Sequence, residues 1–318
     1  MSKVKHVAKK FINQILCAFS LNLVSAQAPK NYVATRREID RLRRNCSLLA
    51  TALIRLESAS VFERKWIWFL IKTLGTLEAK SEGGQDLFAC FVLSDVSNGY
   101  FVEFGAFDGV TYSNTFLLER TGWNGMLIEP IMEAFLQCQE NRKARSIHGL
   151  VDPVFSGVEG SVEVIKAGLQ SSHSIEASGN KSDRVDFEII DETKRRQAKF
   201  AGNIEATPLL NLHDLLDHET ERVDFISIDV EGAEALIVEG FDFNKYNVRA
   251  ACVEHNWRRK DLARIEAVMA KNGFVKVLPE FSSRDAWFVQ SKRFAEVSSA
   301  SYVPLIHPMF RSLIERPA

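Results

Sequence analysis

The sequence has little cysteine and no long apolar run. Its five cysteines lie far apart along 318 residues, which argues against a disulfide framework or a zinc site and favours a reducing compartment. No segment approaches the ~20 consecutive apolar residues needed to span a bilayer. Hydrophobic residues make up 46% and charged residues 25% of the chain, as in soluble globular proteins. We therefore expect a cytoplasmic globular protein.

Charge is nearly balanced overall, with a formal net charge of -1, but it is unevenly distributed. The first 80 residues hold 15 basic and 5 acidic residues, whereas the remainder holds 25 basic and 36 acidic ones. A basic segment on an acidic body indicates either an anionic partner or a solvated helix surface. As the anionic partner we expect a membrane surface, contacted peripherally by the basic helices, and we expect no nucleic acid.

The first 26 residues resemble a signal peptide, because lysines precede an apolar stretch. However, Asn13, Gln14 and Asn22 interrupt that stretch, and its apolar residues repeat with helical spacing. This pattern favours an amphipathic helix over a secretory signal, and export is the less favoured alternative.

Two regions differ in pattern. Residues 1–80 predict a basic, helical N-terminal extension, and Ser81-Glu82-Gly83-Gly84 marks a boundary. Residues 81–318 then alternate strands with helices, except that residues 152–205 are irregular and form a candidate substrate insert around a strand or hairpin at Val162–Ile165.

The alternating region predicts a parallel sheet covered by helices on both faces, because its strands are almost continuously apolar. Ligands of such sheets bind beyond the carboxyl ends of the strands. The expected strands are Tyr100–Phe104, Gly125–Glu129, Ser146–Val151, Val223–Asp229, Val248–Glu254, Phe274–Leu278 and Ala286–Val289. The expected helices are Thr111–Arg120, Ile131–Arg142, Leu209–Leu216, Ala233–Glu239 and Leu262–Lys271.

The turn after the first strand contains two glycines, Gly105 and Gly109, in G-x-x-x-G spacing with Asp108 between them. Glycines there let a ligand approach the backbone closely. A dinucleotide fingerprint has different spacing, and Asp108 would repel a pyrophosphate but attract an ammonium or sulfonium charge. S-adenosylmethionine carries both positive groups. The alternative is that Asp108 caps the following helix.

Two further acids follow neighbouring strands. Glu129 ends the second strand, 26 residues after Glu103, where a carboxylate accepts hydrogen bonds from the hydroxyls of a ribose. Asp152 follows the third strand, on the side where an adenine amino group would lie. For both, a surface turn is the alternative interpretation.

The fourth and fifth core strands end in Asp229 and Glu254 and flank one crevice. Asp229, Glu231 and His255 are candidate bases for a substrate hydroxyl. Alternatively, oxygen atoms of Asp229, Glu254 and Asn256 are candidate ligands for a divalent cation. His255 as a structural histidine and Glu231 as a helix N-terminal charge are equally open.

The ordered set of these motifs resembles the FkbM family of S-adenosylmethionine-dependent methyltransferases. The matching segments are Gly84–Phe88, Phe101–Val110, Ser113–Thr115, Gly122–Gly125, Ile128–Pro130, Val223–Ile226, Ile228–Glu234 and Glu254–His255. The resemblance covers about residues 84–290 and omits the first 80. One departure is Ile131-Met132, where many members have a polar residue and a second proline, which leaves the adenine-side loop open.

The resemblance implies a Rossmann-like methyltransferase fold, with a mostly parallel seven-stranded sheet and a reversed last strand. It implies that Glu103 to Gly109 surrounds the methionine portion of the cofactor, that Glu129 holds the ribose, and that the methyl group goes to oxygen, commonly a hydroxyl of a sugar or other natural product. Our cofactor-binding set is Glu103, Gly105, Ala106, Asp108, Gly109, Asn114, Glu129, Pro130 and Asp152.

The two rival functions are a nicotinamide-dependent oxidoreductase and a non-catalytic docking module with the same fold. The G-x-x-x-G spacing and Asp108 argue against the first, and the intact acids at the strand ends argue against the second. The acceptor is a small molecule or glycan whose identity is not encoded in these motifs, because acceptor contacts usually come from variable loops.

Overall fold

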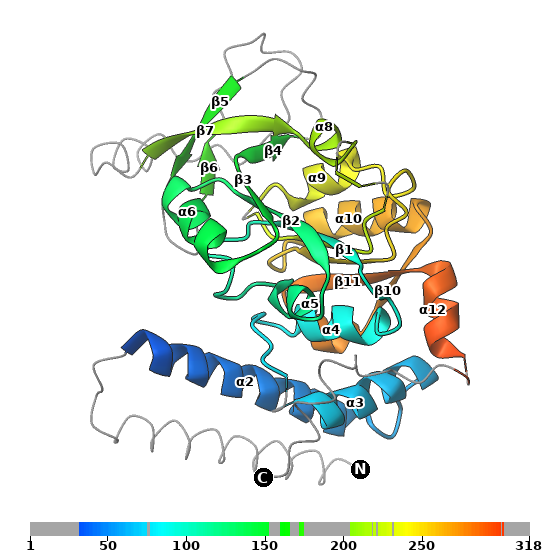
Figure 1. Ribbon diagram of the computed structural model, residues 1–318. Helices are drawn as coiled ribbons and strands as arrows, with labels where there is room; N and C mark the ends of the chain where they lie inside the picture. Colours follow the sequence, from blue (N-terminus) through cyan, green and yellow to red (C-terminus); the bar gives the residue numbers. More distant parts are fainter. Residues whose placement is uncertain are drawn as a thin grey trace.

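The computed structural model describes residues 32–74, 77–152, 160–165, 172–174, 204–217, 219–220, 222–230, 232–299 and 301 (Figure 1). The predicted amphipathic helix near the N-terminus, most of the predicted insert at 152–205, and Glu231 lie outside the described residues.

A seven-stranded sheet forms the centre of the molecule (Figure 1). Five adjacent strands pair in parallel, and β11 is antiparallel to both of its neighbours, β9 and β10. Strand β10 therefore runs in the same direction as these five strands. The mostly parallel sheet that the strand pattern predicts and the reversed last strand that the family resemblance implies are therefore confirmed. The strand order is β10-β11-β9-β8-β1-β2-β3. The bounds are β1 Tyr100–Phe104, β2 Asn124–Glu129, β3 Arg145–His148, β8 Phe225–Ile228, β9 Ala250–Glu254, β10 Phe274–Val277 and β11 Asp285–Gln290.

Helices cover both faces of this sheet, because successive side chains of a strand point to opposite sides. In β1, Phe101 belongs to one hydrophobic cluster, while Val102 and Phe104 belong to the other. The first cluster includes side chains of α4 (Gln85–Val92), α5 (Phe116–Arg120), α6 (Met132–Asn141) and α12 (Ser291–Ser298). The second includes α8 (Leu212–Asp217), α9 (Glu234–Gly240) and α10 (Arg259–Lys271). The short helix α11 spans Pro279–Ser282.

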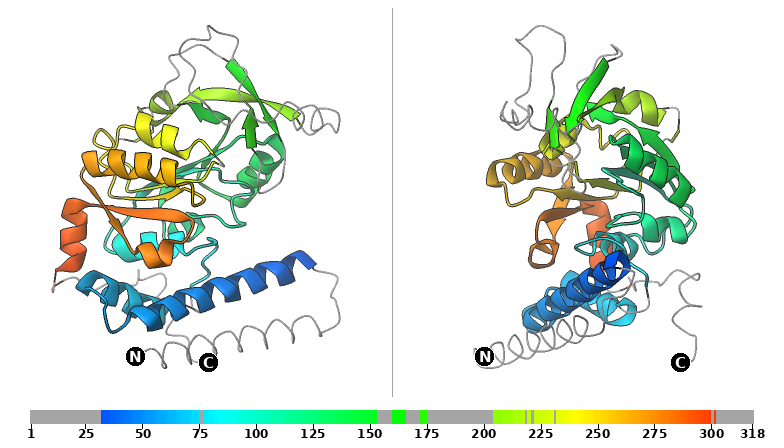
Figure 2. Two further views of the ribbon diagram at one scale, coloured as in Figure 1. Left: turned by 180° about the vertical axis from the view of Figure 1, so that it is seen from behind. Right: turned by 90° about the vertical axis from the view of Figure 1, so that its left-hand side faces the viewer.

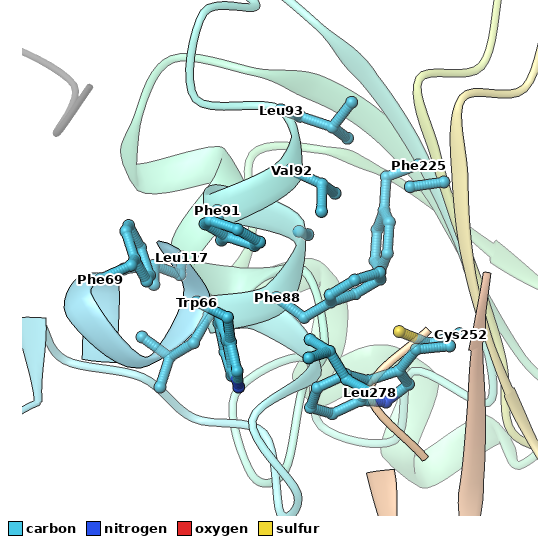
Figure 3. Close-up of a cluster of buried hydrophobic side chains, with 14 of the residues drawn as sticks. Trp66, Phe69, Phe88, Phe91, Val92, Leu93, Leu117, Phe225, Cys252 and Leu278 are labelled. Carbon is cyan, nitrogen blue, oxygen red and sulfur yellow. The ribbon is translucent and has the colours of Figure 1, made fainter. Parts of the chain in front are cut away.

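Among the described residues, two helices lie before the predicted boundary at 81–84, as the sequence predicts: α2 (Tyr32–Arg55) and α3 (Val61–Thr73). A capping box between Ser60 and Glu63 begins α3. Figure 2 shows both helices lying together along one side of the molecule, opposite the small sheet. Trp66 of α3 is fully buried among other apolar side chains, including Phe88 and Phe91 (Figure 3). Its ring centroid lies 5.9 Å from that of Trp287 on β11. Helix α3 is therefore packed into the core beneath the sheet.

A second, four-stranded sheet has the order β4-β7-β5-β6. Its strands are β4 (Leu150–Asp152), β5 (Gly160–Ile165), β6 (Ser172–Ser174) and β7 (Ile204–Asn211). The strand or hairpin predicted at Val162–Ile165 is confirmed as β5. The helix predicted from Leu209 begins only at Leu212, because residues 209–211 pair with β4 as the end of β7.

Two other predicted boundaries were wrong. The single strand expected at 146–151 is divided at Gly149 into β3 and β4, which belong to different sheets. A side chain at position 149 would come within 2.2 Å of Leu210, so the close approach of β7 requires glycine there. The helix expected from Thr111 begins at Phe116, because buried carboxylates hold residues 110–115 in turns.

Candidate functional site

A cavity of about 290 Å³ lies at the carboxyl ends of β1, β2, β8 and β9. This is the edge at which parallel sheets bind ligands. Its charged lining is strongly acidic, with five carboxylates and one guanidinium. These side chains are Glu82, Glu103, Glu129, Asp229, Glu254 and Arg284.

The turn after β1 packs closely against the residue that follows β8. Gly105 has a φ of 78°, and a β-carbon there would lie 1.9 Å from the carbonyl oxygen of Asp229. Gly105 and Ala106 line the cavity. Gly109, with a φ of 75°, instead packs against Arg142 and Cys138 and is not among the lining residues. The two glycines thus serve close packing of the chain, and only the first faces the cavity.

Asp108 holds the turn that follows. Its carboxylate accepts hydrogen bonds from the backbone N–H of Val110 at 2.9 Å and of Thr111 at 2.6 Å, and from the Thr111 hydroxyl at 2.6 Å. It is not among the cavity-lining residues, whereas Thr111 and Tyr112 are. The geometry matches the capping alternative for Asp108, except that it caps a turn and not the helix.

Glu103 is buried beneath the cavity floor and organises the loop above it. Its carboxylate accepts hydrogen bonds from the Asn114 N–H at 2.6 Å, the Ser113 hydroxyl at 2.9 Å and the Thr115 hydroxyl at 2.5 Å. Burial raises the pKa of Glu103, and Arg142, 3.8 Å away, acts in the opposite direction. Glu103 is therefore a residue that positions Asn114.

Asn114 lines the cavity and has a side-chain oxygen without a hydrogen-bond partner among the described residues. Its amide nitrogen donates to the Ser227 hydroxyl at 2.9 Å, which fixes the orientation of the side chain. Its Oδ1 is buried and has no hydrogen-bond partner among the described residues. A buried acceptor left unpaired costs about 1–3 kcal/mol, so this atom is suited to a ligand donor such as an ammonium group.

Glu129 is held at the end of β2 by two backbone donors. The N–H of Phe107 donates to Oε2 at 2.7 Å, and the N–H of Ile131 donates to Oε1 at 2.9 Å. Glu129 and Pro130 line the cavity beside the apolar residues Leu150 and Val151. Asp152 is the last residue of β4, and its side chain is outside the described ones.

Asp229 and Glu254 line the opposite end of the cavity, as the sequence predicts for neighbouring strand ends. His255 is buried but is not among the lining residues, and its Nδ1 accepts a hydrogen bond from the Trp257 N–H. Burial lowers the pKa of His255. Of the three candidate bases, the structure therefore brings only Asp229 to the cavity, and Glu231 lies outside the described residues.

Two residues near this end were not predicted from the sequence: Arg284 and the buried Asp285, which is not among the lining residues. Arg284 lines the cavity and forms an ion pair with Glu82. Asp285 accepts a hydrogen bond from the Gln85 amide, and its register partner in β9 is Glu254. The reversed strand was the available signal: the first residues of an antiparallel strand lie at the carboxyl edge of its parallel neighbours.

Burial and neighbouring charges shift the pKa values of both Arg284 and Asp285. Burial raises the pKa of Asp285 to about 8, and the nearby Asp229 carboxylate acts in the same direction. Burial opposes ionisation of Arg284, but the surrounding carboxylates, Glu82 first, raise its pKa. Perturbed groups in a cleft are typical of functional sites, and of these two residues Arg284 lines the cavity.

The described part of the chain contains no group of three His, Cys, Asp or Glu side chains able to hold a metal ion. Of the candidate cation ligands, Asn256 donates its amide to the Glu254 carboxylate at 2.7 Å. Among the described cysteines, Cys46, Cys90, Cys138 and Cys252 are all free thiols.

Comparison with protein families gives the assignment. A family model described as the methyltransferase FkbM domain matches residues 103–276, more than half of the chain. The chain belongs to the FkbM methyltransferase family. The match begins at Glu103 and includes Asn114, Glu129, Asp229 and Glu254, so this FkbM protein has its predicted strand-end residues inside the family region. A comparison with curated proteins gave no match.

Proposed function

We propose that this FkbM methyltransferase binds S-adenosylmethionine in the 290 Å³ cavity and transfers its methyl group to a hydroxyl oxygen of a sugar or glycan. The acidic lining is the observation that carries the proposal. At neutral pH the cofactor has a net positive charge from its sulfonium and ammonium groups, which five carboxylates and one guanidinium favour.

The individual groups of the cavity fit the parts of this cofactor. The buried Asn114 Oδ1 is suited to accept from the ammonium group. Glu129, fixed by two backbone bonds, is suited to the ribose hydroxyls, and Leu150 and Val151 offer an apolar wall for adenine. The same lining is unfavourable to the pyrophosphate of a nicotinamide dinucleotide, which argues against the oxidoreductase alternative.

When bound, S-adenosylmethionine supplies a methyl group that an acceptor oxygen attacks, so that the C–O bond forms as the S–C bond breaks and the sulfur keeps the electron pair. The protein contributes mainly by holding the reactants in contact. Asp229, at the end of β8, accepts the proton that the hydroxyl loses. This role distinguishes the enzyme from a non-catalytic module with the same cofactor site.

Isothermal titration of S-adenosylmethionine and S-adenosylhomocysteine tests the cofactor assignment. We expect Glu129→Gln to weaken binding roughly tenfold to 150-fold, because a hydrogen bond to a charged group contributes about 1.5–3 kcal/mol. Glu133→Gln is the matched control, since Glu133 is exposed on α6. A well-folded wild-type protein that binds neither compound would refute the proposal.

A specific observation also favours peripheral contact with an anionic membrane. Among the described residues, ten large hydrophobic side chains are exposed, and seven of them lie between positions 49 and 71: Leu49, Leu53, Ile54, Leu56, Val61, Trp68 and Ile71. Residues 32–73, which contain α2 and α3, have nine basic and four acidic residues. None of the described helices is long and apolar enough to cross a membrane. We propose that this surface rests on anionic lipid.

Sedimentation with phosphatidylserine vesicles tests this contact. We expect Trp68→Ser with Ile71→Ser to reduce the bound fraction several-fold. Leu136→Ser, which removes a side chain of similar exposure from α6, should leave it unchanged. Equal sedimentation of all three proteins would refute the membrane proposal without affecting the methyltransferase proposal.

A further inference from the structure

A second cavity, of about 490 Å³, lies between α2 and the segments 78–82 and 110–112. It is adjacent to the first cavity, because Glu82, Thr111 and Tyr112 line both. Helix α2 lies before the part of the chain that the family model matches. This wall is therefore a feature of the present chain that the family assignment does not explain.

Buried polar contacts fix α2 against the cavity. Arg44, 7% exposed, donates hydrogen bonds to the carbonyl oxygens of Ala79 at 3.1 Å and Ser81 at 2.7 Å. On the other side, the Tyr112 hydroxyl donates to Asp40 at 2.9 Å. These contacts connect the helix with the same turn that borders the first cavity.

Tyr112 holds an unfavourable backbone conformation at the junction, with a φ of 59°. Such conformations are unfavourable for a non-glycine residue and concentrate at functional sites. Here the conformation is maintained by Asp108, which binds the preceding residue, and by a bridge between Ser81 and Tyr112. The strained residue stands between the two cavities.

The second cavity is lined by a mixture of hydrogen-bond donors and acceptors. Its charged side chains are Glu38, Asp40, Arg41, Arg44, Glu78, Lys80 and Glu82, and its apolar lining is limited to Ala79 and Val110. Each hydroxyl of a sugar both donates and accepts a hydrogen bond, so a polyhydroxylated ligand can satisfy such a surface. Several of these side chains already pair with one another, as in Glu38–Arg41 and Glu78–Lys80. An apolar acceptor would remove their remaining donors and acceptors from water without replacing those hydrogen bonds, which is costly.

We propose that the second cavity is the acceptor site and that it takes a sugar-like polyol, so that α2 forms one wall of the active site. The proposal rests on the methyltransferase function proposed above. Glu82 links the two cavities, because its partner Arg284 lines the first cavity together with Asp229. An acceptor seated against α2 reaches Asp229 past this ion pair. Its hydroxyl oxygen then gains the methyl group, and Asp229 takes the proton.

The test combines cofactor titration with methyl transfer from methyl-labelled S-adenosylmethionine to a panel of neutral methyl glycosides. We expect the full-length wild-type protein to methylate at least one glycoside. Arg41→Ala and Asp40→Asn should raise the KM for that glycoside about tenfold and leave the Kd for S-adenosylmethionine within twofold. Arg64→Ala is the control, because Arg64 lies on α3 and is absent from the cavity lining.

The outcomes separate this inference from the proposed function. Unchanged KM in both cavity variants, or cofactor binding lost in both while they remain folded, would show that the second cavity is not the acceptor site. A wild-type protein that binds S-adenosylmethionine but methylates no glycoside would overturn the polyol assignment. Failure to bind the cofactor at all would instead refute the methyltransferase proposal.

Discussion

The two adjoining cavities are built in different ways. The first is formed largely by strand ends and the turns that follow them, between Glu103 and Glu254, within the family region. The second depends on α2 and residues 78–82, which precede that region. In our proposal, the sheet inside the family region binds the cofactor, and a helix outside that region selects the acceptor. This division is consistent with the general variability of acceptor contacts.

The largest effect should come from the residue nearest the proposed chemistry. We expect Asp229→Asn to lower kcat for methyl transfer about 10²- to 10⁴-fold, the usual contribution of a general base, with cofactor affinity changed little. Steady-state transfer assays and cofactor titration measure the two quantities. A wild-type kcat in this variant would show that Asp229 is not the base and would favour Glu254, which ends the neighbouring strand β9 and also lines the cavity.

The next substitution, Arg142→Met, tests the buried ion pairs that support Glu103 in the first cavity. Arg142 is fully buried and pairs with Glu119 at 3.0 Å and with the buried Glu103 at 3.8 Å. Leaving a buried charge without its partner costs about 3–5 kcal/mol, so we expect a loss of this size in the free energy of unfolding, measured in urea.

Arg145→Met is the control for that measurement. Arg145 is half exposed and pairs with Glu219 at the surface, where ion pairs contribute about 0–1 kcal/mol. Equal destabilisation by the two substitutions would mean that the Glu103 cluster does not depend on Arg142.

The smallest effect, taken per pH unit, concerns Asp285, which is buried next to Arg284 at the acidic end of the first cavity. Because the pKa of Asp285 is raised to about 8 in the folded protein, that state retains a proton that the unfolded chain loses near pH 4. The free energy of unfolding should therefore fall as pH rises from about 4 to 8, by at most about 1.4 kcal/mol per pH unit from this group.

Asp285→Asn should remove this contribution and flatten the dependence of Tm on pH across that interval. Asp214→Asn, on the exposed surface of α8, should preserve the wild-type slope. Parallel curves for wild type and Asp285→Asn would show that Asp285 is ionised in the folded protein at neutral pH.

Much of the first cavity was predictable because its residues follow parallel strands. Glu103, Glu129, Asp229 and Glu254 belong to consecutive sheet strands whose carboxyl ends meet at one edge. Their positions at the strand ends therefore predicted correctly that the four side chains line one cavity. The same reasoning did not separate Gly109 and Asp108, which support the turn, from Gly105, which faces the cavity, because all three lie in one continuous segment.

Hydrophobic periodicity predicted the alternation of strands and helices and placed the acids at the strand ends, because this pattern is a local property of the chain. The reversed last strand was implied only by the resemblance to the FkbM family. Tertiary contacts set where α2 packs, where Arg284 and Asp285 lie relative to β9, and why the strand expected at 146–151 divides at Gly149. Each of these depends on side chains from segments distant in sequence: Arg44 against residues 79–81, β11 against β9, and β7 against Gly149. Such contacts are fixed by packing in three dimensions, which no local pattern encodes.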